Sequence, residues 1–113
     1  MSLKASSREI DGITVIDLDG RIALGDGSVV LHNLIRDNLD KGNLKLLLNF
    51  SAVNYLDSTG LGELVSGYRQ VKSKNGELKL LNVNKKISDL LQITKLYAVF
   101  DIHNNEGQAL ASF

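Results

Sequence analysis

A nearly unbroken apolar run in the middle of the chain restricts the fold more than any other feature. The run covers Leu44–Phe50 and is interrupted only by Lys45 and Asn49. A strand that is apolar at almost every position is covered on both faces, as strands of parallel sheets are. After a short polar segment, apolar residues recur at helical spacing through Val71. The pattern predicts a buried strand followed by an amphipathic helix, which is the repeating unit of α/β proteins.

The rest of the chain repeats this alternation. Strands are expected in a hairpin over Arg8–Leu18 with its turn at Asp11-Gly12, and then over Glu77–Val83 and Tyr97–Ile102. Helices are expected over Val29–Leu39, from Asp57 or Ser58 to a stop at Asn75-Gly76, after a cap at Asn84, and in a short segment opening at Asn105. The order β-β-α-β-α-β-α-β-α predicts a mostly parallel, twisted sheet with an antiparallel N-terminal edge strand.

Composition and charge narrow the classes of function. The chain has 113 residues, which suits one domain spanning residues 1–113. Lys plus Arg and Asp plus Glu both number 13, so the basic excess that a nucleic-acid surface needs is missing. Cysteine is absent, which excludes disulfides and thiolate chemistry. No apolar run reaches the roughly 18 residues of a membrane span, and no signal-peptide core is present, so we expect a cytoplasmic protein.

The sequence shows no catalytic or cofactor motif. His32 is expected on the solvent side of a helix and His103 directly after a strand, and no serine lies in a G-x-S-x-G elbow. Gly60-Leu61-Gly62 is followed by Val65 where a dinucleotide fingerprint has its third glycine. The histidines and carboxylates have no metal-ligand spacing. We therefore expect a binding module that is not an enzyme and uses no cofactor.

The glycine-rich segment Asp19–Ser28 is expected to be a loop. Its glycines either make a flexible connection or let the backbone approach a ligand or a partner, and the sequence leaves both open. Asp26 or Ser28 is expected to cap the helix that follows.

Two adjacent hydroxyls, Ser58 and Thr59, stand where the central strand gives way to its helix. A helix N-terminus favours negative charge, so Ser58 is either a simple cap or a site that accepts a phosphoryl group. Gly60 and Gly62 are poor helix formers in a first turn. They serve either close approach by another molecule or tight packing on the sheet.

The segment Asp57-Ser58-Thr59-Gly60-Leu61-Gly62, with the strand residues 49–56 before it, resembles the signature of STAS domains, in particular bacterial anti-sigma factor antagonists. The resemblance covers about residues 8–113 and the order of elements. It implies binding to a cognate anti-sigma factor, a GHKL-type ATP-dependent serine kinase, which frees a sigma factor for transcription. That kinase would phosphorylate Ser58, in preference to Thr59, and release the antagonist, and a PP2C-type phosphatase would reset it.

The same resemblance implies a partner-binding surface that consists of Asp57, Ser58, Thr59, Gly60, Leu61 and Gly62, with Gly25 and Asp26 from the neighbouring loop. One departure concerns that loop. Many antagonists carry G-x-[IL]-D after the second strand, whereas here Gly20-Arg21-Ile22 is followed by Ala23.

Three other functions are compatible with the sequence. The first is a STAS scaffold or accessory subunit of a stress-signalling or lipid-transport assembly, in which the same surface docks a partner without a sigma factor. The second is a small-ligand sensor that uses the loop over residues 20–27. The third is a hydrolase that needs Ser58 and a histidine.

Overall fold

The computed structural model describes residues 3–113, so Met1 and Ser2 of the predicted domain lie outside the described residues. Five strands form one sheet in the order β1-β2-β3-β4-β5, with β1 antiparallel to β2 and the other pairs parallel. The elements are β1 Leu3–Ile10, β2 Ile13–Ile22, α1 Asp26–Asp40, β3 Lys45–Leu56, α2 Ser58–Ser73, β4 Glu77–Leu81, α3 Lys85–Ile93, the 3-10 helix η1 Leu96–Ala98, β5 Asp101–His103 and α4 Glu106–Ala111. This arrangement confirms the predicted fold class and order of elements.

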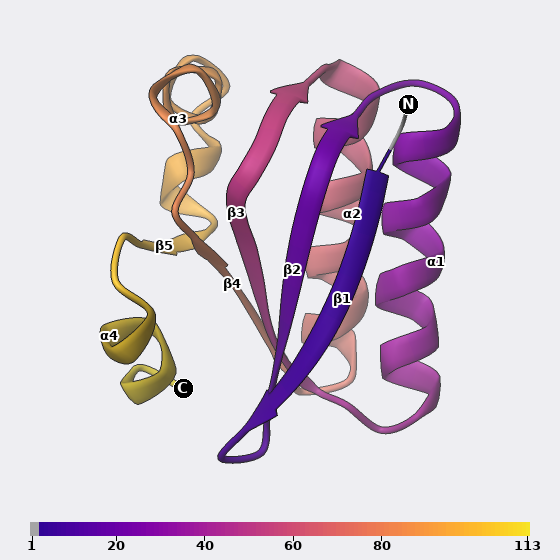
Figure 1. Cartoon of the computed structure of the whole chain (residues 1–113), viewed down its shortest axis with the longest axis vertical. Helices are drawn as coiled ribbons and strands as arrows, with labels where there is room; N and C mark the ends of the chain where they lie inside the picture. The colour runs from indigo at the N-terminus through magenta and orange to yellow at the C-terminus, as the bar shows by residue number, and fades with distance from the viewer. Residues whose placement is uncertain (1–2) are drawn as a thin grey trace.

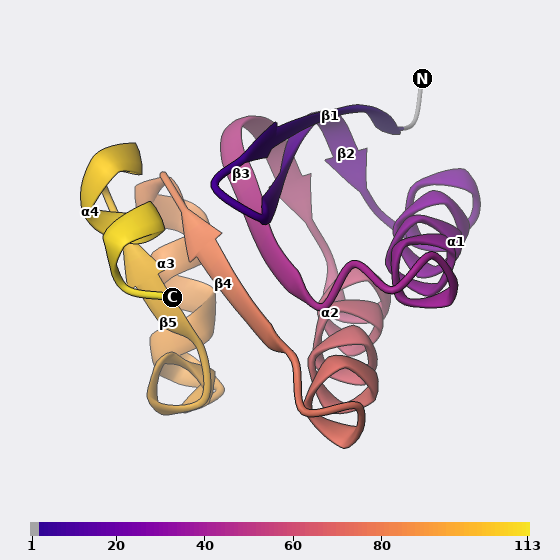
Figure 2. The same ribbon diagram turned by 90° about the horizontal axis from the view of Figure 1, so that it is seen from below.

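Helices cover both faces of the sheet, as the apolar run in β3 requires. Helices α1 and α2 lie side by side against one face (Figure 1), and the view from below places α4 on the far side of the strands from them (Figure 2). The larger core cluster includes Leu46 and Leu48, and a smaller cluster with Ala109 of α4 includes Leu47. Consecutive leucines of β3 therefore point into different cores, and all three are fully buried.

The N-terminal hairpin is longer than the sequence pattern indicates. Its turn is the predicted one, with positive φ at both Asp11 and Gly12. However, β2 continues to Ile22 and β3 continues past Phe50 to Leu56, and the two strands stay paired to these ends. Register shifts along this pairing break the regular alternation of apolar residues, which is why the pattern ended both strands too early.

The expected loop over Asp19–Ser28 is wrong because β2 extends into it. Only residues 23–25 connect β2 to α1. The expected caps, Asp26 and Ser28, are also wrong. Gly25 occupies the N-cap position with φ 98°, and no side chain in the described part of the chain caps the helix. The Ser28 hydroxyl instead donates to the Gly25 carbonyl over 3.0 Å.

The C-terminal third differs from the prediction in its strands. β4 ends at Leu81, and Asn82 adopts a left-handed φ of 60°. The strand expected over Tyr97–Ile102 is replaced by η1 and the three-residue β5. The caps of α3 and α4 are confirmed, since the side chains of Asn84 and Asn105 each accept a hydrogen bond from a first-turn amide over 2.9 Å.

A buried lysine that the sequence analysis did not identify attaches α4 to the sheet. Lys79 of β4 is only 7% exposed. Its ammonium donates to the carbonyl and hydroxyl oxygens of Ser112 over 2.7 and 3.0 Å, and pairs with Asp101 over 2.9 Å. The ring of Phe113 lies 4.9 Å from it. This lysine therefore satisfies the carbonyl at the end of α4 while it bridges β4 and β5.

Candidate functional site

Asp57 is the N-cap of α2 and connects two parts of the predicted site. One carboxylate oxygen, Oδ1, accepts from the Gly60 amide over 2.8 Å, and the other, Oδ2, accepts from the Leu24 amide over 2.9 Å. The hydrogen bond from the Gly60 amide, and after it the one from the Leu24 amide, holds the pKa of the Asp57 carboxyl below its ordinary value. The carboxylate therefore joins the start of α2 to the short connection between β2 and α1.

Ser58 is left free by this arrangement. It is the first residue of α2 and is exposed, as Thr59 is. Within residues 3–113, no side-chain hydrogen bond of Ser58 is found, because Asp57 already serves as the cap. The interpretation of Ser58 as a simple cap is therefore wrong, and its hydroxyl is available to solvent.

The two first-turn glycines have different surroundings. A Cβ on Gly60 would collide with the backbone oxygen of Ile22, so this position is glycine for packing against β2. A Cβ on Gly62 would meet nothing within 4 Å, and Gly62 is exposed. Leu61 between them is 7% exposed and belongs to the larger core cluster. Packing explains Gly60 and Leu61, whereas it does not explain Gly62.

The connection over residues 23–25 lies against Asp57 and is held from both sides. The Asp57 amide donates to the Ile22 carbonyl over 3.3 Å, and the Ser28 amide donates to the Ala23 carbonyl over 2.9 Å. Gly25 and Asp26 are both exposed at this place. The structure thus brings the loop part of the predicted surface to the Asp57–Gly62 part.

Sequence reasoning missed the most conspicuous side chain of this connection. Leu24 is 77% exposed although it is apolar. In the sequence it ends the apolar triplet Ile22-Ala23-Leu24 ahead of Gly25, and nothing in that triplet marks it as exposed. The hydrogen bond from its amide to Asp57 joins residues 33 positions apart in the sequence, so no local pattern could have predicted it.

Two further pairs flank this surface. His32 of α1 approaches Glu63 of α2, with 3.2 Å between Nδ1 and Oε1. Arg21 lies over the ring of Tyr55 at the ends of β2 and β3, 4.0 Å from the ring centroid. His32 is thus half-buried against a helix rather than freely solvated, and Tyr55 remains 41% exposed.

The histidines do not form a hydrolytic relay. Nε2 of His103 lies 3.1 Å from Asp101 and 3.3 Å from the Ser112 hydroxyl. A relay needs the acid and the nucleophile on different ring nitrogens, whereas here one nitrogen contacts both. His32 contacts Glu63 instead of a serine.

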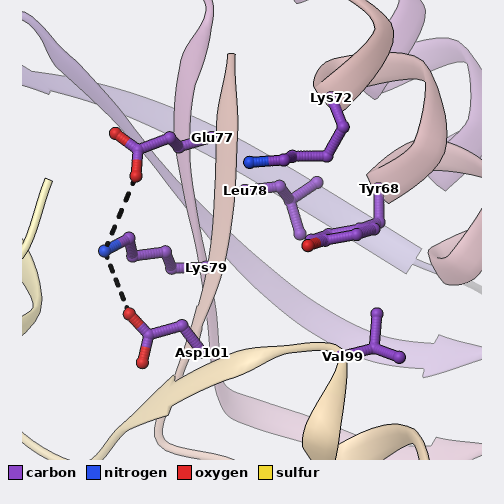
Figure 3. Close-up of a pocket in the computed structure, with 7 residues that line it drawn as sticks. All are labelled: Tyr68, Lys72, Glu77, Leu78, Lys79, Val99 and Asp101. Carbon is purple, nitrogen blue, oxygen red and sulfur yellow. Dashed lines mark ion pairs between the residues drawn. The ribbon is translucent and has the colours of Figure 1, made fainter. Parts of the chain in front are cut away.

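A small pocket lies elsewhere, between α2, β4 and the segment that leads into β5 (Figure 3). Its volume is about 140 Å³, and Lys79 forms ion pairs with Glu77 and Asp101 along its side. The lining residues are Tyr68, Lys72, Glu77, Leu78, Lys79, Val99 and Asp101. None belongs to the Asp57–Gly62 segment or to residues 20–27.

No group of three or more His, Cys, Asp or Glu side chains within residues 3–113 could hold a metal ion. In the same part of the chain, no helix combines the length and apolar character needed to cross a membrane.

Comparisons with known proteins place this geometry in a family. The family model of the STAS domain matches residues 4–109. The anti-sigma-B factor antagonist of Bacillus subtilis is 28% identical over 102 residues, which cover 90% of this chain and 92% of the relative. The crystal structure of an anti-sigma factor antagonist from Mycobacterium paratuberculosis has a TM-score of 0.87 at 22% identity, and covers 98% of this chain and 93% of its own.

The phosphorylated form of the Bacillus cell fate determinant SpoIIAA has the same fold, with a TM-score of 0.75 at 19% identity and coverage of 96% of this chain and 98% of its own. These relatives are named as antagonists of another protein, which is a regulatory binding role and agrees with the expected binding module. Because the family model spans nearly all of residues 3–113 and the fold agrees with that of these structures, the chain belongs to the STAS domain family.

Proposed function

We propose that this protein is an anti-sigma factor antagonist, a single STAS domain that works in the cytoplasm. It binds a cognate anti-sigma factor and so frees a sigma factor, and phosphorylation of Ser58 switches it off. The observation that carries the proposal is the division of roles at the start of α2. Asp57 caps the helix through Gly60, which leaves the Ser58 hydroxyl exposed and unused. The relatives that are named as antagonists of anti-sigma factors support the choice of partner.

The position of Ser58 suits a switch that acts on binding and leaves the fold intact. A phosphoryl group adds about −1.5 to −2 charge at neutral pH, and a helix N-terminus tolerates negative charge well. The modified side chain projects from the first residue of α2 into solvent. A partner that covers the same place would bury this charge unpaired, at a cost of about 2–5 kcal/mol, or roughly 30- to several-thousandfold in affinity.

The partner would be a GHKL-type serine kinase that transfers the γ-phosphoryl group of ATP to the Ser58 oxygen. A PP2C-type phosphatase would hydrolyse the resulting ester. We assign the direct contacts to the exposed members of the predicted surface, which are Ser58, Thr59, Gly62, Gly25 and Asp26. Gly60 and Leu61 are buried, so they shape this surface from below. Asp57 positions its two halves relative to each other.

The test is a pull-down from the native cell extract with three baits: the unmodified protein, Ser58→Ala and Ser58→Asp. We expect an ATPase-related kinase to bind the first two baits and to be lost with the third. The captured kinase, once purified, should phosphorylate the unmodified protein and a Thr59→Ala control, but not Ser58→Ala.

The same experiment separates the switch from a scaffold role. If all three baits retain one large assembly, Ser58 does not control binding and the protein is a scaffold or accessory subunit. If the purified kinase modifies another residue and binds Ser58→Asp unchanged, the proposed switch is wrong.

A further inference from the structure

Leu24 combines high exposure with a rigidly held backbone. Its side chain is 77% exposed, yet the connection on which it stands is only three residues long. Hydrogen bonds fix the connection on both sides, from Ser28 of α1 and from Asp57 at the start of α2. A mobile loop could fold an apolar side chain away from water, but this connection holds Leu24 outward.

Local helix structure does not account for this leucine. Leu24 and Val29 occupy the N′ and N4 positions relative to the Gly25 N-cap, where apolar residues often pack together as a hydrophobic staple. A working staple would bury both side chains, whereas Val29 remains 55% exposed and Leu24 even more so. The stability of α1 is therefore not the main use of this side chain.

One hydrogen bond, from the Leu24 amide to the Asp57 carboxylate, places Leu24 beside the proposed phosphorylation site. The Asp57 carboxylate that accepts from the Leu24 amide belongs to the residue before Ser58. An apolar side chain that is already ordered loses little entropy when a partner covers it, which is the property of a binding hot spot.

We propose that Leu24 is the apolar anchor of the partner-binding surface and that Asp57 is the residue that positions it. The partner is a protein with an apolar pocket for a leucine side chain, directly beside the place where it contacts Ser58. The inference rests on the proposed function, since Leu24 and Ser58 belong to the same surface. The effects of Leu24 and Asp57 on binding can nevertheless be measured separately from those of Ser58.

The variant Asp57→Ser isolates the positioning role. Serine is a good N-cap and can retain the bond to the Gly60 amide, but its side chain is too short to span to Leu24 as well. In the free protein, we expect amide exchange measured by NMR to become at least about tenfold faster at Leu24 and to change little at Gly60. A tenfold change corresponds to the loss of one hydrogen bond of about 1.4 kcal/mol. Unchanged exchange at Leu24 would overturn the positioning role without any partner.

The variant Leu24→Ala tests the anchor. The probe is the purified protein that the unmodified bait captures, and its affinity is measured by calorimetry. We expect a loss of about 30-fold, the usual size of a hot-spot truncation. Ile93→Ala is the matched control, because Ile93 of α3 is 79% exposed and is not a member of the proposed partner-binding surface, so its truncation should change the affinity less than about twofold.

A double-mutant cycle joins the two roles. If Asp57 acts through Leu24, Asp57→Ser weakens binding in the natural background by about tenfold but by less than about twofold in the Leu24→Ala background. Additive losses would show that Asp57 contacts the partner directly, and that result overturns positioning. A Leu24→Ala affinity equal to that of the natural protein overturns the anchor, even where Ser58→Asp still abolishes binding. Conversely, a loss with Leu24→Ala but none with Ser58→Asp rejects the phosphoswitch alone.

Discussion

Gly60 and Gly62 of α2 should respond in opposite directions to the same substitution. Alanine stabilises an exposed helix position by about 0.8–1.0 kcal/mol relative to glycine. A Cβ at Gly62 would enter open space, so Gly62→Ala should raise the free energy of unfolding by about 0.8 kcal/mol. A Cβ at Gly60 would overlap the backbone oxygen of Ile22, which cannot withdraw easily because it already accepts from the Asp57 amide.

The cost at Gly60 follows from the size of that overlap. Overpacking commonly costs about 1–3 kcal/mol, and a rigid backbone atom belongs at the upper end of this range. After the gain in helix propensity is subtracted, Gly60→Ala should lose about 2 kcal/mol. The two variants should then differ by about 3 kcal/mol, or by roughly 12 °C in Tm at about 4 °C per kcal/mol for a domain of this size.

Urea unfolding followed by far-UV circular dichroism measures this difference, provided that the variants share one m-value. Gly67→Ala is an internal control, because its Cβ would meet the movable Cδ1 of Ile35 rather than backbone. Its stability should lie between those of the other two variants. A Gly60→Ala protein as stable as the natural one would refute the argument that packing on β2 requires glycine there.

Three further variants and one change of pH test the remaining contacts. Ser58→Ala should change the free energy of unfolding by less than about 0.5 kcal/mol, because Asp57 and not Ser58 caps α2, and urea unfolding would show a larger loss if the assignment were wrong. Lys79→Met should cost about 2 kcal/mol, since it removes three short polar contacts of a buried ammonium, and hydrogen exchange should become faster throughout α4. The free energy of unfolding should fall as the pH drops below about 4. The hydrogen bond from Arg8 holds the pKa of the Asp17 carboxyl below its ordinary value, so the stability that the ionised carboxylate contributes is lost as the pH falls through the lowered pKa. Arg8→Met should make the urea midpoint less dependent on pH in this range, and an unchanged dependence would exclude the Arg8 ion pairs as its source.

Local periodicity was sufficient to predict the order of the elements. The nearly unbroken apolar run in β3 predicted burial on both faces, and the helices and the caps at Asn84 and Asn105 follow from patterns within one or two turns. The element ends were less predictable. β2 and β3 run on to Ile22 and Leu56 because each pairs with the other, and a strand partner is not visible in either segment alone.

Residues close together in the chain suffice to predict that an aspartate, two hydroxyls and two glycines stand where a buried strand meets a helix. The separate roles of these residues depend on contacts with a distant part of the chain. The end of β2 supplies the carbonyl of Ile22 that requires glycine at position 60, and the connection after β2 supplies the amide of Leu24 that donates to Asp57. These contacts join residues more than 30 positions apart, because parallel strands place the ends of β2 and β3 side by side, and they leave the hydroxyls of Ser58 and Thr59 exposed.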